Sequence, residues 1–94
     1  MVKFKLETKE DIQVLTFEIE GGIISPDELI RLELPEIDYK KLITISGRGP
    51  VWLYAYLTHQ LHPSKAVGIN DPRLGVVIVE SHSPGYVVGD VIQI

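Results

Sequence analysis

The sequence predicts a single α+β domain, in which one β-sheet carries two packed helices. A chain of 94 residues is long enough for one domain and a small core, so a partner subunit could add to its stability. Hydrophobic residues make up 45% of the chain and charged residues 23%, as is usual for a folded domain. Short β-branched segments outnumber the helix-like ones, and this balance indicates the α+β class.

The strand-like segments are short, rich in β-branched residues and bounded by turn residues. In residues 13–19, Leu15, Phe17 and Ile19 alternate onto one face, which favours a half-buried strand. The segment LITIS is apolar on both faces, as is typical of a strand in the middle of a covered sheet. The six predicted strands are residues 2–6, 13–19, 42–46, 66–70, 75–81 and 91–94.

A first helix is predicted over residues 26–33. Ser25, followed by Pro26 and then by Glu28, has the pattern of a capping box with proline at the first helical position. A proline at position 35 ends this helix, because the residue before proline disfavours helical backbone angles.

A second helix is predicted over residues 50–62. Leu53, Leu57 and Leu61 recur every four residues and form one apolar stripe. The resulting order, β-β-α-β-α-β-β-β, fits a ferredoxin-like sheet with two helices packed on it, and it also fits a small Rossmann-like arrangement.

Composition narrows the classes of ligand and chemistry. The net charge is −4, so no general basic field attracts long duplex DNA, and an anion has to be bound by a local group of donors. Cysteine is absent, which excludes disulfides and thiolate chemistry. No apolar run reaches the length of a membrane span and the first residues lack a signal-peptide core, so we expect a cytoplasmic protein.

The segment ISGRGP lies between a predicted strand and the second helix. Gly47 and Gly49 would let backbone amides approach an anion at the positive end of the helix dipole. Arg48 would add a planar fork suited to phosphate oxygens, and Ser46 a hydroxyl. The pattern indicates a phosphate-binding loop, although a plain strand-to-helix turn with a solvated arginine has the same spacing.

A second arginine follows the next predicted strand. If residues 66–70 run parallel to residues 42–46, then Arg73 and Arg48 lie at the same edge of the sheet, beside Asp71. The simpler interpretation is that Asp71 caps the turn and pairs with Arg73.

The three histidines of the chain are expected at the opposite end of the sheet. His59 and His62 are three residues apart on the second helix, a spacing suited to metal binding or to acid/base work. His82 follows residues 75–81, which return to the end where the helix finishes. Because the helix is about 20 Å long, one subunit cannot bring the arginines and the histidines to one phosphate. We therefore expect a composite site between copies of the chain.

Two segments, ISGRGPVWLYAYLTHQLH and INDPRLGVVIVESHS, resemble the small CRISPR-associated ring nucleases of the third Csx family. The resemblance covers residues 43–90, about half the chain, and is specific because it combines SGRGP, a paired-histidine helix, DPRLG and SHS. It implies an enzyme that cleaves cyclic tetra-adenylate with a divalent metal, typically manganese, and that is also described as a deadenylating RNA exonuclease. It further implies ferredoxin-like homodimers, two of which can enclose the ligand.

The resemblance also implies roles for individual residues. The ligand-binding residues would be Ser46, Gly47, Arg48 and Gly49. The catalytic residues would be His62, Asp71 and Arg73, and the metal ligands His59, His62 and His82. The alternatives are a related Rossmann-like fold of the CARF type and, for function, a non-catalytic module that binds cyclic oligoadenylate or single-stranded RNA.

Overall fold

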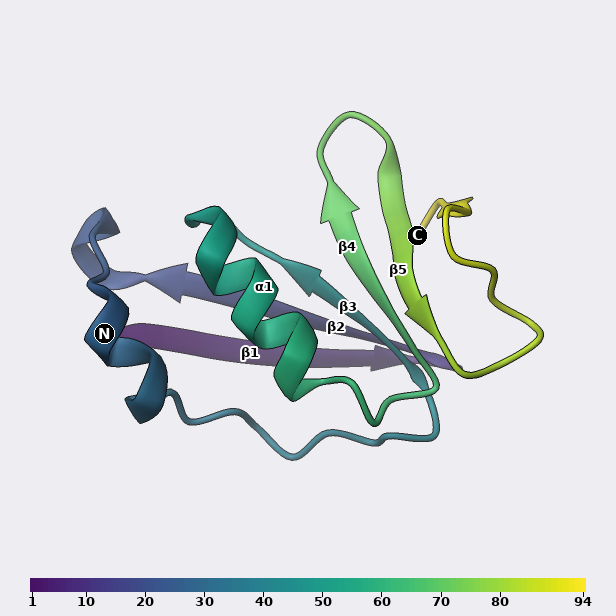
Figure 1. The fold of residues 1–94 in the computed structure, drawn as a ribbon, viewed down its shortest axis with the longest axis horizontal. Helices are drawn as coiled ribbons and strands as arrows, with labels where there is room; N and C mark the ends of the chain where they lie inside the picture. The colour runs from purple at the N-terminus through teal and green to yellow at the C-terminus, as the bar shows by residue number, and fades with distance from the viewer.

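The computed structural model describes residues 1–94 and contains one six-stranded sheet (Figure 1). The strands lie in the order of the sequence, so each one pairs with the strand before it. They are β1 (Val2–Lys9), β2 (Ile12–Ile19), β3 (Leu42–Ser46), β4 (Ala66–Asp71), β5 (Gly75–Ser81) and β6 (Val91–Ile92).

The sheet is mixed. β2, β3 and β4 are parallel to one another, whereas β1 is antiparallel to β2, and β5 is antiparallel to both β4 and β6. The α+β class is confirmed, with helices packed on a sheet. The strand order differs from that of a split βαβ sheet. A sheet of the ferredoxin type interleaves its strands, whereas the strands of this sheet lie in sequential order. The parallel run brings the carboxyl ends of β2, β3 and β4 to one edge of the sheet.

Both predicted helices form, but they differ in type. Residues Pro26–Arg31 form a 3₁₀ helix, η2, which starts with the predicted capping box: the Ser25 N–H donates to Glu28 Oε2 at 2.9 Å. It ends before residue 33 because the backbone of Leu32 is extended. A short 3₁₀ turn, η1 (Glu20–Gly22), precedes it and was not predicted.

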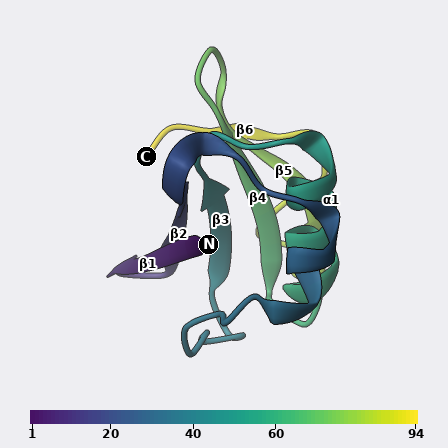
Figure 2. The ribbon, with the colours of Figure 1, turned by 90° about the vertical axis from the view of Figure 1, so that its left-hand side faces the viewer.

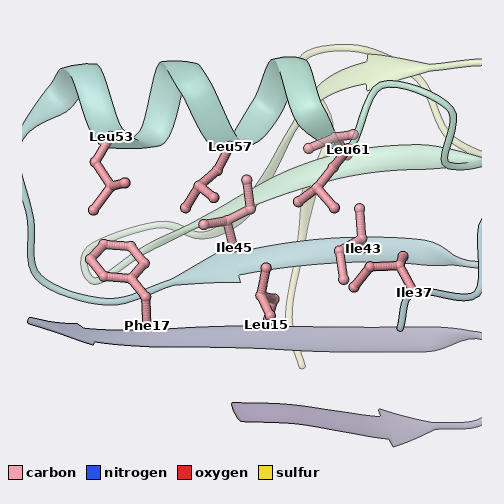
Figure 3. Close-up of a cluster of buried hydrophobic side chains, with 9 residues drawn as sticks. Leu15, Phe17, Ile37, Ile43, Ile45, Leu53, Leu57 and Leu61 are labelled. Carbon is pink, nitrogen blue, oxygen red and sulfur yellow. The ribbon is translucent and has the colours of Figure 1, made fainter. Parts of the chain in front are cut away.

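The helix α1 (Val51–Gln60) covers one face of the sheet, as Figure 2 shows. Leu53, Leu57 and Leu61 are fully buried and point towards the sheet, as predicted from their spacing (Figure 3). They pack on a cluster of buried residues from the strands and from the connection before β3, namely Leu15, Phe17, Ile37, Ile43, Ile45 and Val67. This packing fixes both ends of α1 over the sheet. No helix of the structure has the length and apolar character needed to cross a membrane.

Candidate functional site

The first candidate site is the edge of the sheet where β3 and β4 end, which we call the arginine rim (residues 46–49 and 70–73). The parallel pairing of β3 with β4 places Ser46 beside Asn70, and Asn70 Nδ2 donates to Ser46 Oγ at 3.2 Å. The predicted parallel arrangement is therefore confirmed. Asn70 was missed by the sequence reasoning, although its position next to Asp71 at a strand end was the signal that could have found it.

The loop of residues 47–49 packs closely against Phe17 because Gly47 and Gly49 have no side chains. Gly47 has φ +147°, and a Cβ there would lie 2.6 Å from the Phe17 carbonyl oxygen. A Cβ on Gly49 would lie 2.8 Å from Phe17 Cε1. Both glycines are thus required for the loop to pack on Phe17, which fixes the exposed Arg48 between them.

Tyr54, near the start of α1, also holds this loop in place. Its hydroxyl donates to the Gly47 carbonyl oxygen, and its ring meets Phe17 edge to face with centroids 5.2 Å apart. Burial raises the pKa of Tyr54, so the phenol remains a proton donor. The hydrogen bond from Tyr54 also occupies the Gly47 carbonyl oxygen, which would otherwise repel an anion.

The arginine rim has unused donors. Arg48 and Arg73 are exposed and neither forms an ion pair, although the chain has more acidic than basic residues. The N–H groups of Arg48 and Gly49 donate to no group of the protein, and the start of α1 has no side-chain cap. A surface pocket of about 500 Å³ lies beside Arg48 and is lined by Thr16, Phe17, Glu18, Ile19, Gly22 and Arg48. This arrangement suits an anionic ligand.

Asp71 has a structural role in the turn between β4 and β5. Its Oδ1 accepts hydrogen bonds from the N–H groups of Arg73 and Leu74, at 2.8 and 3.0 Å. The interpretation that Asp71 caps the turn is confirmed, and its contact with Arg73 is to the backbone. No hydrogen bond uses Asp71 Oδ2, so that oxygen is free to contact a ligand.

The second candidate site lies at the opposite end of the sheet and contains His62, Glu80 and His82, which we call the histidine cluster. Glu80 Oε1 lies 2.7 Å from His62 Nδ1 and 3.6 Å from His82 Nε2. The two imidazole rings meet edge to face, with centroids 4.9 Å apart. About half of each histidine side chain is exposed, so the cluster is open to a ligand.

His59 does not belong to this cluster, although it lies in the last turn of α1 at the same end of the sheet. Glu80 takes its place beside the other two histidines. The sequence reasoning missed Glu80, but a signal was present: residues two apart in a strand point to the same face, and Glu80 is two residues before His82.

The histidine cluster fits a divalent metal. Its three donor atoms lie within 4.8 Å of one another. Metal–ligand bonds of about 2.0–2.2 Å place neighbouring donors roughly 3 Å apart, and the two distances from Glu80 Oε1, 2.7 and 3.6 Å, lie on either side of that value. Two imidazole nitrogens and one carboxylate oxygen suit manganese, iron or zinc, with open positions left for a substrate.

The two sites are well separated. The helix α1 starts directly after the arginine rim and ends two residues before His62. Its ten residues span about 15 Å. Figure 1 shows the helix running along the sheet between the two ends.

Comparison with known proteins places the chain in a family. The protein-family model described as CRISPR-associated protein (Cas_csx3) matches residues 17–93. The chain belongs to the Csx3 family of CRISPR-associated proteins. It is also 43% identical over 89 residues to an uncharacterized protein of Aquifex aeolicus (strain VF5), with 89% of this chain and 79% of the relative covered.

The region that matches the Csx3 family contains both candidate sites. It begins at Phe17, which supports the loop of the arginine rim, and it extends past His82 to β6. Only β1 and most of β2 lie before it. A CRISPR-associated role therefore follows from family membership.

Proposed function

We propose that this Csx3 protein is a ring nuclease that binds cyclic tetra-adenylate and cleaves it to linear oligoadenylate with the help of a divalent metal, expected to be manganese. The observation that carries the proposal is the combination of two features: an edge of the sheet whose two arginines form no ion pair, and a cluster of two histidines and a glutamate. A phosphodiester substrate needs both binding of charge and stabilisation of charge in the transition state.

The arginine rim binds the phosphates in this proposal. Arg48 supplies charge-assisted hydrogen bonds, and the unused N–H groups of the loop and of the first turn of α1 supply the rest. Gly47, Gly49 and Ser46 shape the surface that the ligand contacts. A flexible ring can meet such a local set of donors, whereas a duplex would meet a chain of net charge −4.

The cleavage step uses residues of both sites. A ribose 2′-hydroxyl attacks the neighbouring phosphorus and gives up its proton to water, the bond to the 5′-oxygen breaks, and that oxygen takes up a proton from water. The ring thereby opens to a linear product that ends in a cyclic 2′,3′-phosphate and a 5′-hydroxyl. Arg73 offsets the negative charge that develops on the phosphoryl oxygens, and Asp71 Oδ2 orients the attacking hydroxyl. The metal, when bound by His62, Glu80 and His82, supplies Lewis-acid stabilisation of that charge.

The reaction requires more than one copy of the chain. Because the arginine rim and the histidine cluster lie at opposite ends of α1, a phosphate bound at one cannot reach the other in the same subunit. A homodimer that assembles into a tetramer around the ligand would bring the rim of one copy to the cluster of another.

The test is to incubate the protein with cyclic tetra-adenylate, with and without manganese, and to separate the products by chromatography. We expect metal-dependent cleavage that is lost in His62→Ala and kept in His59→Ala, a matched control from the same helix end but outside the cluster. Mixing His62→Ala with Asp71→Ala should restore part of the activity. No cleavage by the wild type would contradict the nuclease, and a mixture that stays inactive while both variants fold would contradict the composite site.

The same rim could serve a non-catalytic module for cyclic oligoadenylate or single-stranded RNA. The unpaired Arg48 and the free loop amides favour this second function, because they need no contribution from the histidine cluster. Binding without turnover would support the module. A second incubation with poly(A) RNA checks for removal of nucleotides from the 3′ end.

A further inference from the structure

We propose that Asn70 is a positioning residue for the anionic ligand, because it turns the hydroxyl proton of Ser46 towards the bound phosphate. The inference rests on the proposed binding of phosphates at the arginine rim. It assigns a role to a residue that lies beside the loop of residues 47–49 but outside it.

The placement of Asn70 follows from the parallel pairing of β3 with β4. Ile45 pairs with Ile69, so the next residues, Ser46 and Asn70, lie side by side where both strands end. Both side chains are half-buried, and Asn70 Nδ2 lies 3.2 Å from Ser46 Oγ. The contact therefore lies at the carboxyl edge of the parallel strands, where ligands of open sheets bind.

The chemistry of a hydroxyl group decides the direction of the Ser46 proton. A serine hydroxyl has one proton to donate and two lone pairs that accept. Since the amide N–H of Asn70 occupies one lone pair, Ser46 donates its own proton elsewhere. No group of the protein accepts that proton, so it is available to a phosphate oxygen beside Arg48.

A purely structural role for Asn70, that of holding β3 and β4 together, explains its contact with Ser46 less well. The backbone ladder already joins β3 to β4 over residues 42–45 and 66–69, and the Asn70 amide makes no other hydrogen bond. Its second N–H and its carbonyl oxygen are unused by the fold. An asparagine that held the strands together would be expected to use more of its groups.

The control comes from the same strand. Thr44 lies two residues before Ser46 on the same face of β3, and its hydroxyl is buried without a hydrogen-bond partner. Thr44→Val removes a hydroxyl from β3 without touching the arginine rim. We expect this variant to bind ligand as the wild type does, and to be at least as stable.

The experiment measures dissociation constants by calorimetry for cyclic tetra-adenylate and for inorganic phosphate, in a His62→Ala background that prevents turnover. Loss of a neutral hydrogen bond predicts that Asn70→Ala weakens binding by roughly 3- to 10-fold, and loss of a bond to a charged group predicts roughly 10- to 100-fold for Ser46→Ala. Asn70→Asp should weaken binding more than Asn70→Ala, because a carboxylate accepts the Ser46 proton and repels the phosphate. Thermal midpoints should change little in the Asn70 variants.

The double variant Ser46→Ala with Asn70→Ala decides whether Asn70 acts through Ser46. If it does, the double variant binds as weakly as Ser46→Ala alone. Additive losses, or normal binding by Asn70→Ala, would overturn the inference. Binding of phosphate but not of cyclic tetra-adenylate would remove the proposed substrate and leave the inference standing. Failure of the His62→Ala protein to bind either ligand would overturn both.

Discussion

The two glycines of the arginine rim meet Phe17 in different ways, and this difference predicts different responses to the same substitution. A Cβ on Gly47 would meet the Phe17 carbonyl oxygen at 2.6 Å, and the residue has φ +147°. A Cβ on Gly49 would meet only side-chain atoms, with Phe17 Cε1 at 2.8 Å and Cζ at 3.0 Å. The first conflict is with the backbone as well as with the Phe17 ring, whose Cδ2 and Cδ1 lie 2.8 and 2.9 Å from that Cβ, and the second is with side chains alone.

The expected costs follow from these contacts. Gly47→Ala combines backbone strain of about 1–3 kcal/mol with overpacking of about 1–3 kcal/mol. Gly49→Ala has only the overpacking of about 1–3 kcal/mol. For a domain of this size, each kcal/mol lowers the thermal midpoint by roughly 4–8 °C. Both variants should be less stable, Gly47→Ala by more.

Phe17→Leu separates the two effects because it removes the ring atoms that Gly49→Ala meets. In that background, Gly49→Ala should lose most of its cost, because the remaining close contact is with the end of a flexible side chain, Ile19 Cδ1 at 3.3 Å. Gly47→Ala should keep the strain of its positive φ and its conflict with the carbonyl oxygen of residue 17, because neither depends on the ring.

The assay is urea denaturation followed by the fluorescence of Trp52, the sole tryptophan of the chain. The quantity compared is the free energy of unfolding of each alanine variant with Phe or Leu at position 17. If Phe17→Leu relieves both glycine variants equally, or relieves neither, then Gly47 and Gly49 do not meet Phe17 in different ways, and the reasoning is refuted.

Three further predictions concern the core, the histidine cluster and the start of η2. Leu57→Ala should lower the free energy of unfolding by about 2–5 kcal/mol in the same urea assay, because Leu57 is fully buried. Glu80→Gln should weaken manganese binding, measured by calorimetry, by roughly 10-fold or more, since a neutral amide is a poorer metal ligand than a carboxylate; unchanged affinity would exclude Glu80 as a ligand. The Ser25 N–H and the N-terminal ammonium group hold the pKa of Glu28 below its ordinary value of 4.5. The stability that Glu28 contributes is therefore present above pH 4.5 and is lost as the pH falls through the folded-state pKa. In thermal melts, Glu28→Gln should be less stable than the wild type at pH 7 and nearly as stable as the wild type at low pH.

Local pattern was enough to predict most of the elements, but not how they pair. Strands β3 and β5 have the predicted bounds, because buried β-branched runs between turn residues allow little else. The strand β1 extends to Lys9, three residues beyond its predicted end, since an edge strand tolerates exposed polar residues. Only Glu10 and Asp11 remain as the turn, and Glu10 takes a positive φ of 55°. The sequential strand order depends on contacts between distant segments, which periodicity does not encode.

The two candidate sites were predicted only in part, again because sequence pattern does not encode contacts between distant segments. The spacing of His59 and His62 assumed that the helix continues, but α1 ends at Gln60 and the backbone of Leu61 has left helical geometry. The two histidines therefore do not share a helical face, and His62 turns to Glu80 instead. The contact between Ser46 and Asn70 required the pairing of β3 with β4, which the sequence only suggested.

The sequential order of the strands also bears on how the chain reaches its native state. Because every strand pairs with its predecessor, the sheet can grow one strand at a time from the hairpins β1–β2 and β4–β5. The longest loop that must close is the connection between β2 and β3. Its entropic cost is modest, because the cost of closing a loop rises only slowly with its length. Contacts of short sequence separation favour rapid folding. We therefore expect refolding that is fast for a mixed sheet, with the pairing of β2 and β3 as the slow step.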